Sequence, residues 1–286
     1  MENLNNFTYS EIIPVRPITL LYGKCNSGKS LILKSIRDTN FNNYPSIFEH
    51  PGNPTDNTCP LIEMPRSLIK RYYNPLDIYD VLSVPDKCIY LAKEDIESKL
   101  FDKIKNNTQI RQEINQQLKY FNLNCEFLHS SDSELYLVDK FTNERITIRR
   151  LNHLNYSLVN ASSGLRSILP IILYSIIEKG ITLLLDHPES HIHPQMQSEI
   201  GSLLTKCIKP PINNRFIVET HSELLILRLQ NLIRKGQLSS DNISVIYVSR
   251  NTEKTHCTPL HLDQYGNFIS EWPNGFFEED FKEVFG

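Results

Sequence analysis

Hydrophobic positions from residue 168 onward follow two spacings in turn. Apolar residues at helical spacing predict helices over residues 168–177, 194–206 and 223–234. Between and after them lie short apolar runs typical of buried strands, at residues 181–185, 215–219 and 242–249. Short apolar strands that alternate with helices indicate a mostly parallel sheet covered by helices on both faces. This part of the chain therefore predicts an α/β fold.

The first 90 residues are harder to interpret from the pattern alone. Residues 17–22 form an apolar run that predicts a buried strand, and residues 30–37 predict a helix soon after it. Residues 40–90 then carry seven of the 16 prolines. That spacing excludes long helices and favours loops and short edge strands.

The middle of the chain predicts a helical pair followed by a β-hairpin. Apolar residues three and four apart between residues 92 and 122 indicate two amphipathic helices, broken near Asn106 and Asn107. Alternating positions then predict three strands, at residues 125–128, 134–139 and 145–149. A turn is expected at residues 139–144, between the last two strands. We expect residues 40–150 to form an insertion of loops, helices and a hairpin within one domain that covers residues 1–286.

The last residues of the chain are too apolar for a solvated tail. Five aromatic residues fall within fourteen positions, namely Trp272, Phe276, Phe277, Phe281 and Phe285. Aromatic side chains of this kind bury against a protein surface or form a patch that binds a partner. We expect residues 260–286 to dock on the domain.

Composition and charge narrow the class of protein. Hydrophobic residues make up 40% of the 286 positions and charged residues 22%, which is ordinary for a globular protein. A net charge of -3 gives no overall basic footprint for nucleic acid. The basic cluster of Arg145, Arg149 and Arg150 could be a nucleic-acid patch, although alternating charges on a hairpin explain it as well.

Two further observations concern location. The six cysteines are scattered without a C-x-x-C pair, which suits a reducing cytosol. The longest apolar runs are too short and too interrupted to span a membrane, and the first residues lack the features of a signal peptide. We expect a cytoplasmic protein.

The strongest motif lies between the first predicted strand and helix. Residues 23–30 read Gly-Lys-Cys-Asn-Ser-Gly-Lys-Ser and fit G-x-x-x-x-G-K-[ST], the P-loop. Such a loop wraps phosphate groups with its backbone N–H groups at the start of a helix. Lys29 would reach the β- and γ-phosphates, and the Ser30 hydroxyl would bind Mg²⁺. The candidate nucleotide-binding residues of this loop are Gly23, Lys24, Asn26, Ser27, Gly28, Lys29, Ser30 and Leu31.

Three later stretches could complete a nucleotide site. Asp186 ends an apolar strand, as in a Walker B motif, and could hold Mg²⁺ opposite Ser30, directly or through water. Ser162, Ser163 and Gly164 precede a buried helix and could bind an anion, although an ordinary N-cap explains them too. His221 follows a strand at the edge where ligands bind in parallel sheets, and a core histidine is the alternative.

The residues around His187 are similar to a zinc-binding motif. The run from His187 to His191 is similar to the zinc motif H-E-x-x-H, but its glutamate, Glu189, stands one place late. Pro188 disfavours the regular helix that this motif needs. Since His193 is near in sequence, a metal site stays an alternative to simple packing before the next helix.

Taken in order, these motifs resemble the ABC-type ATPase head. That head is shared by the structural-maintenance-of-chromosomes (SMC) proteins and the overcoming-lysogenization-defect (OLD-like) ATPases. Stretches similar to those of bacterial OLD-like AAA ATPases lie at residues 16–23, 185–194 and 219–223. ATPases of this kind occur in anti-phage defence modules such as Septu, Gabija and retron-associated systems. The motifs cover most of residues 16–37 and 158–286.

The resemblance implies a mechanism built on two chains. Ser162, Ser163 and Gly164 stand where the ABC signature stands, so they would contact ATP bound to a second subunit of a homodimer. His221 stands at the switch-histidine position and Asp186 at the Mg²⁺ position. Such heads usually have a glutamate directly after the Walker B acid as the catalytic base. This chain has His187 there, so Glu189 or His187 would have to serve, and we expect slow hydrolysis.

The sequence thus predicts an ATPase that dimerises around ATP and regulates a separate effector, such as a nuclease or a retron component. A nucleotide-dependent switch that does not hydrolyse ATP is an alternative, as is an SMC-like or DNA-repair ATPase that acts directly on nucleic acid. A self-contained OLD-type nuclease is disfavoured, because only some 65 residues follow His221.

Overall fold

The centre of the protein is a six-stranded sheet with the order β12-β11-β1-β10-β9-β2. The computed structural model describes residues 15–41, 88–91, 96–129, 135–150, 155–158, 160–250 and 255–270. Five strands of the sheet run parallel, and they are β1 (Ile18–Tyr22), β2 (Cys88–Leu91), β9 (Thr182–Asp186), β10 (Arg215–Thr220) and β11 (Ile243–Arg250). The edge strand β12 (Thr255–Leu260) is antiparallel to β11.

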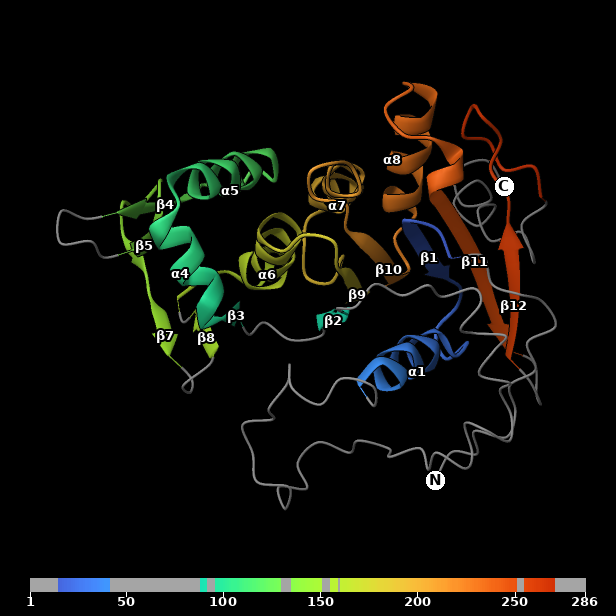
Figure 1. The fold of residues 1–286 in the computed structure, drawn as a ribbon, viewed down its shortest axis with the longest axis horizontal. Coiled ribbons are helices and arrows are strands. Elements are labelled where there is room, and N and C mark those ends of the chain that lie inside the picture. The colour runs from blue at the N-terminus through green and yellow to red at the C-terminus, as the bar shows by residue number, and fades with distance from the viewer. Residues whose placement is uncertain are drawn as a thin grey trace, which may run out of the picture.

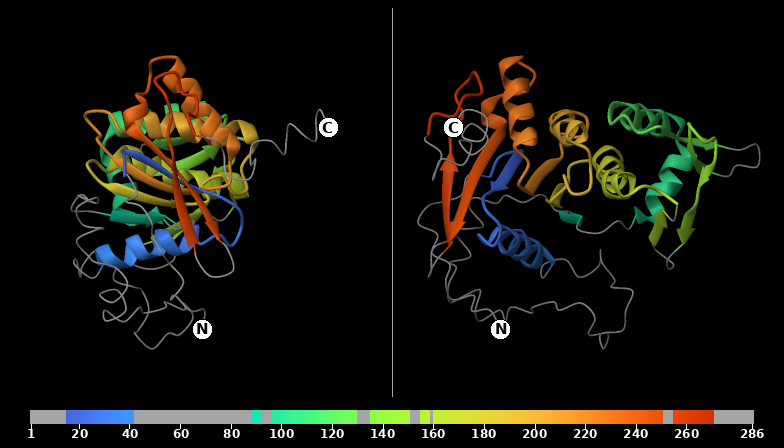
Figure 2. Two further views of the ribbon diagram at one scale, coloured as in Figure 1. Left: turned by 90° about the vertical axis from the view of Figure 1, so that its right-hand side faces the viewer. Right: turned by 180° about the vertical axis from the view of Figure 1, so that it is seen from behind.

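Helices cover both faces of this sheet (Figure 1). Helix α1 (Lys29–Phe41) lies on one face, and the other face carries α6 (Ser163–Ile177), α7 (Pro194–Cys207) and α8 (Glu223–Arg234). Successive strand residues point to opposite faces, so Leu20 packs in the cluster of α6, α7 and α8, whereas Leu21 packs with Leu33 of α1. Figure 2 shows the same layers from the side and from behind. The expected α/β fold with a mostly parallel sheet is confirmed.

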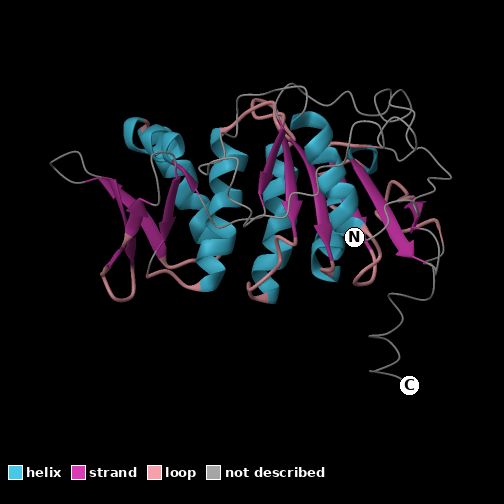
Figure 3. Cartoon of the chain, turned by 90° about the horizontal axis from the view of Figure 1, so that it is seen from below, coloured by secondary structure: helices cyan, strands magenta, loops and turns pink. Residues whose placement is uncertain are grey.

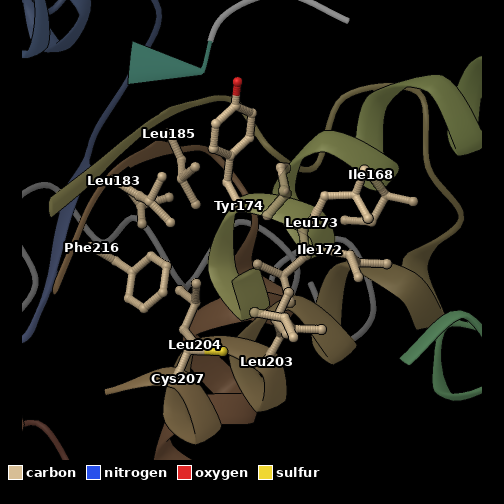
Figure 4. Close-up of a cluster of buried hydrophobic side chains, with 14 of the residues drawn as sticks. Ile168, Ile172, Leu173, Tyr174, Leu183, Leu185, Leu203, Leu204, Cys207 and Phe216 are labelled. Carbon is tan, nitrogen blue, oxygen red and sulfur yellow. The ribbon is translucent and has the colours of Figure 1, made fainter. Parts of the chain in front are cut away.

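The larger core lies between the sheet and α6 and α7 (Figure 4). Its members are buried side chains from four elements: Ile168, Ile172 and Leu173 of α6, Leu183 and Leu185 of β9, Phe216 of β10, and Leu203, Leu204 and Cys207 of α7. Helix α6 is buried along its length because α4 and α5 contact it on the side away from α7. That explains why its sequence is apolar all round instead of along one stripe.

A smaller lobe continues the row of helices at one end of the molecule (Figure 3). It contains α4 (Ser98–Asn106), α5 (Thr108–Tyr120) and a sheet of β4 (Cys125–His129), β5 (Leu135–Asp139) and β6 (Arg145–Ile146). The predicted helix break is confirmed, because the Asn107 side chain accepts a hydrogen bond from the Ile110 N–H (3.1 Å) and begins α5. A second sheet joins β3 (Ile96–Glu97), β8 (Asn155–Leu158) and β7 (Ile148–Arg150).

Three details differ from the sequence prediction. The run 145–149 was expected to be one strand, but it is divided into β6 and β7, which belong to different sheets. Strand β2 lies within the predicted insertion 40–150, yet it pairs with β9 in the central sheet, because Ile89 is an apolar residue that can be buried there. The pattern also missed β8 and β12. Both are short, and β12 contains a proline and polar residues.

The described part of the C-terminal segment follows β12 and folds back on the domain. A short 3₁₀ helix, η2 (Ser240–Asn242), precedes β11, and residues 262 and 268 form a bridge after β12. Leu262 and Phe268 pack against the main core, and Gln230 of α8 donates a hydrogen bond to the Gly266 carbonyl (2.6 Å). The five aromatic residues expected to dock lie at positions 272–285, outside the described residues. Among the described residues, no helix combines the length and apolar character needed to cross a membrane.

Candidate functional site

The P-loop connects the carboxyl end of β1 to α1 and depends on its two glycines. Gly23 has φ 150°, and a Cβ atom there would lie 2.1 Å from the Val248 carbonyl oxygen. Gly28 has φ 104°, another conformation that side chains disfavour. The Leu31 and Ile32 N–H groups both donate to the Gly28 carbonyl as the helix begins. The loop therefore has the tight backbone that the sequence motif predicts.

Lys29 turns back into this loop. Its Nζ atom donates to the Gly23 carbonyl (2.9 Å), the Lys24 carbonyl (2.8 Å) and the Ser27 hydroxyl (3.4 Å). The side chain is only 3% exposed. Burial lowers the pKa of Lys29, while the nearby Glu219 carboxylate acts in the opposite direction. A cation is thus held inside the loop where a phosphate would lie. Lys24 and Asn26 are exposed around it.

The side chain next to Ser30 is Glu219, to which the sequence analysis gave no role. The Ser30 hydroxyl donates to Glu219 Oε1 at 2.7 Å. Parallel register explains the meeting, because Glu219 of β10 lies opposite Leu21 of β1 on one side and Asp186 of β9 on the other. The signal in the sequence was an acidic residue inside the apolar run 215–219, two positions before His221.

His187 directly follows β9 and lies near three carboxylates. Its Nε2 atom lies 3.2 Å from Glu219 Oε1 and 3.9 Å from Asp186 Oδ1, and its Nδ1 atom lies 3.4 Å from Glu189 Oε1. The hydrogen bond with Glu189, followed by that with Glu219, raises the pKa of His187 to about 10, although burial opposes the shift. The residue has φ 45°, a left-handed conformation that His adopts more readily than most residues.

Glu189 lies within reach of both histidines. Its Oε1 atom accepts a hydrogen bond from the His221 N–H at 2.7 Å. Burial alone would raise the pKa of Glu189, but the hydrogen bonds from His187 and from the His221 N–H outweigh it, so the pKa is lowered. Its Oε2 atom is buried and has no hydrogen-bond partner among the described residues. The carboxylate is therefore ionised, and its contacts with the two histidines hold it in place within the loop that follows β9.

His221 stacks on His187. The two ring centroids are 4.8 Å apart and the ring planes differ by 10°. Burial, followed by the positive charge of Lys29, lowers the pKa of His221. Its Nε2 atom lies 3.8 Å from the Cys25 sulfur of the P-loop. The histidine thus joins the end of β10 to the loop after β1, at the edge expected from the sequence.

Asp186 is placed at the same edge by the end of β9. Its Oδ2 atom accepts a hydrogen bond from the Tyr90 hydroxyl of β2 at 2.8 Å. The sequence suggested that Asp186 would stand opposite Ser30, whereas in the structure the direct partner of Ser30 is Glu219. Glu219 thus joins Asp186 as a candidate cation ligand on this edge of the sheet.

The Ser-Ser-Gly stretch begins α6 close to the loop that carries His187. The Ser162 hydroxyl accepts a hydrogen bond from the Leu165 N–H (3.2 Å). Ser162 is therefore an N-cap of α6, the alternative to an anion-binding role that the sequence left open. Ser162 and Ser163 are exposed. A Cβ atom on Gly164 would lie 3.3 Å from the His191 carbonyl oxygen, which shows how closely the two loops pack.

The zinc-like spacing does not gather its histidines. His191 and His193 are exposed, and His193 begins α7 by accepting a hydrogen bond from the Gln195 N–H (3.2 Å). Among the described residues, the group with ligand atoms all within 4.8 Å of one another is Asp186, His187 and Glu219. The group that could hold a metal therefore joins His187 to strand-end acids instead of to the later histidines.

These residues fit a nucleotide and a divalent cation. The P-loop is tight at Gly23 and holds the Lys29 ammonium, which suits phosphate. Glu219 Oε2 is buried without a hydrogen-bond partner among the described residues, and a cation would satisfy it. Ser30, Asp186 and Glu219 supply the oxygen ligands that Mg²⁺ prefers.

Comparison with known families places the chain. A family described as "AAA domain, putative AbiEii toxin, Type IV TA system" matches residues 62–228, more than half of the sequence. The chain belongs to this AAA-domain family. The matched part of the AAA domain contains Asp186, Glu219 and His221 and begins after the P-loop. A second family, described as a protein of unknown function (DUF3696), matches residues 238–285.

Solved structures similar to this AAA-domain protein include SMC heads. An SMC head bound to the C-winged helix domain of ScpA is 14% identical with a TM-score of 0.48, covering 88% of this chain and 92% of that one. The SMC head domain from Thermotoga maritima is 16% identical with a TM-score of 0.45, covering 90% and 96%. Comparison with curated proteins gave no match.

Proposed function

We propose that this AAA-domain protein binds Mg²⁺–ATP at the carboxyl edge of its sheet and hydrolyses it slowly. The observation that carries the proposal is the convergence of three loops. The P-loop after β1, Asp186 after β9 and His221 after β10 lie at the ends of neighbouring parallel strands. Ligands of open α/β sheets bind at this edge. Membership of an AAA-domain family supports the same conclusion.

Each residue has a definite task in this proposal. The N–H groups of the P-loop and the Lys29 ammonium would hold the phosphates, and Ser30, Asp186 and Glu219 would hold Mg²⁺. Bound Mg²⁺ neutralises phosphate charge during phosphoryl transfer. His221, fixed by its N–H bond to Glu189, would contact the terminal phosphate.

Hydrolysis also needs a catalytic base that orients the attacking water, and we propose Glu189 for this role. Glu189 is ionised and partly buried beside both histidines, which supports it as the group that orients water, with His187 as the alternative. No carboxylate directly follows Asp186, so we expect a low basal rate. A switch that binds ATP without hydrolysing it would follow if neither residue serves.

The proposed assembly is a two-fold dimer around ATP. Exposed Ser162 and Ser163 at the start of α6 would contact the nucleotide of the partner subunit. Because such a site is complete only when two chains meet, ATP would act as a dimerisation ligand. Light scattering should show a dimer with ATP and Mg²⁺ that Ser162→Arg weakens and Gln112→Arg, on the exposed side of α5, does not. A monomer under all nucleotide conditions would contradict the dimer.

The dimer would regulate a separate effector. The family description names an AbiEii toxin and a type IV toxin–antitoxin system, which supports a place in a multi-component bacterial system. We propose a defence role in which the effector, a nuclease or a retron component, carries the toxic chemistry. Direct action on nucleic acid is the alternative, although the net charge of -3 does not favour it.

The decisive experiment measures ATP affinity by calorimetry. Lys29→Ala removes the buried ammonium of the P-loop, so affinity should fall at least tenfold, which is about 1.4 kcal/mol. Lys34→Ala is the matched control, because Lys34 lies on the same helix but is exposed. Equal ATP affinity in the wild type and Lys29→Ala would remove the basis of the proposed function.

A further inference from the structure

A histidine and two carboxylates meet at one point beside the P-loop. His187 Nε2 lies 3.2 Å from Glu219 Oε1 and 3.9 Å from Asp186 Oδ1, and each of the three residues offers one ligand atom within 4.8 Å of those of the other two. Ligand atoms on one tetrahedral metal, each at about 2.0–2.2 Å from it, are about 3.3–3.6 Å apart. Small side-chain movements would therefore bring all three onto a single cation.

The orientation of His187 suits a metal ligand. Its Nδ1 atom is 3.4 Å from Glu189 Oε1 and can donate a hydrogen bond to it, and a metal that displaces the Nε2 proton would meet a lone pair directed at Asp186 and Glu219. Metal-ligating histidines usually donate their other ring N–H to a carboxylate, which fixes the tautomer and the ring. The stack on His221 restrains the ring further.

Glu219 provides a second, independent observation. Its side chain is 2% exposed, and its Oε2 atom has no hydrogen-bond partner among the described residues. Buried carboxylate oxygens are normally paired, because leaving them without a partner costs free energy. The Oε1 atom already contacts Ser30 and His187, so the remaining oxygen is the natural position for a cation.

The backbone holds the cluster together before any ligand arrives. The His187 N–H donates to the Glu219 carbonyl at 3.0 Å, and Asp186 and Glu219 are partners in the parallel register of β9 and β10. His187 itself is kept at φ 45°, a conformation that costs free energy and persists where the surrounding structure enforces it. The three ligands come from one chain, so binding requires neither a nucleotide nor a partner subunit.

We infer that Asp186, His187 and Glu219 bind a late first-row divalent cation directly, with Zn²⁺ and Co²⁺ preferred over Mg²⁺. Imidazole nitrogen is a good ligand for Zn²⁺ and its neighbours, whereas Mg²⁺ binds through oxygen and keeps several waters. The inference deepens the proposed function, because Asp186 and Glu219 also belong to the proposed Mg²⁺ site and His187 would make Zn²⁺ or Co²⁺ the preferred cation there when no nucleotide is bound. It rests on that function only for the cation's part in ATP turnover.

The experiment titrates Co²⁺ into the chelator-treated full chain without nucleotide and follows its visible absorption, with Zn²⁺ and Mg²⁺ as competitors. The wild type should bind one Co²⁺ per chain, displaced by Zn²⁺ but not by an equal concentration of Mg²⁺. His187→Asn should lower Co²⁺ affinity at least tenfold, since Asn tolerates the left-handed backbone but lacks the imidazole. His193→Asn is the matched control, because His193 is exposed and Asn also caps helices.

Two results would overturn the inference. One is equal Co²⁺ affinity in His187→Asn and His193→Asn, which would mean adventitious binding to surface groups. The other is displacement of Co²⁺ by Mg²⁺ and Zn²⁺ alike. If His187→Asn is not folded by circular dichroism, Glu219→Gln provides the same test, since it removes one ligand and keeps the shape. Calorimetry with ATP on the same proteins reports separately on the proposed nucleotide site, so failure of one conclusion is distinguishable from failure of the other.

Discussion

The two ends of β10 hold buried polar residues with opposite character. Asn214, just before the strand, is 1% exposed and fully paired: its Oδ1 accepts from the Ile181 N–H (3.1 Å), and its Nδ2 donates to the carbonyls of Ser175 and Glu178 (3.0 and 2.9 Å). Glu219, at the other end, is equally buried but keeps an unpaired oxygen among the described residues.

This difference separates structural from functional polarity. Asn214 connects the end of α6 to the starts of β9 and β10, and every hydrogen-bonding atom of its amide is used within the fold. A buried polar group with an unused atom is unfavourable for folding alone and often marks a catalytic or ion-binding position. The start of β10 thus contributes to the stability of the fold, whereas its end provides a candidate site for a ligand.

The largest expected effect is at the structural end. Asn214→Leu removes three buried hydrogen bonds and leaves one N–H and two carbonyl groups without this partner. The free energy of unfolding should fall by about 3–5 kcal/mol. Chemical denaturation followed by circular dichroism measures it, with Asn106→Ala as control, because Asn106 is exposed at the end of α4. A loss of unfolding free energy no larger than that of Asn106→Ala would contradict the structural role of Asn214.

A smaller effect is expected on the rate of hydrolysis at the functional end. Glu189→Gln keeps the size of the side chain but removes the charge beside His187 and His221, so phosphate release should fall by about a hundredfold, the lower range for general-base catalysis. His187→Ala should lower the rate less. If Glu189→Gln keeps the wild-type rate while His187→Ala abolishes it, His187 is the base and Glu189 is not.

The smallest expected effect is the stability of Glu219→Gln. Glutamine can still accept the hydrogen bonds from Ser30 and His187, and His187 keeps Glu189 as a charged partner when the Glu219 charge is lost. The free energy of unfolding should therefore change by less than about 1 kcal/mol. Denaturation beside Asn214→Leu gives a direct comparison of the two ends. Losses of similar size would show that Glu219 is as structural as Asn214.

Much of the architecture could be predicted from local pattern. The helix at 168–177, the break at Asn107 and the alternation of helices and strands after residue 180 depend on neighbouring residues along the chain. The misses were long-range. Whether residues 145–149 form one strand, or whether Ile89 joins the central sheet, depends on which strands become neighbours, and nothing in those short runs encodes it.

The candidate site divides in the same way. The P-loop was evident from eight consecutive residues, because the backbone angles of Gly23 and Gly28 and the position of Lys29 are set within the loop itself. Asp186, His187, Glu189 and His221 could be named as candidates, but not placed in contact. The sequence by itself determined the α/β class, the loop and the types of ligand available. Only the tertiary structure decided that Glu219 lies between Ser30 and His187, because that meeting depends on the parallel register of β1, β10 and β9, which joins residues far apart in the chain.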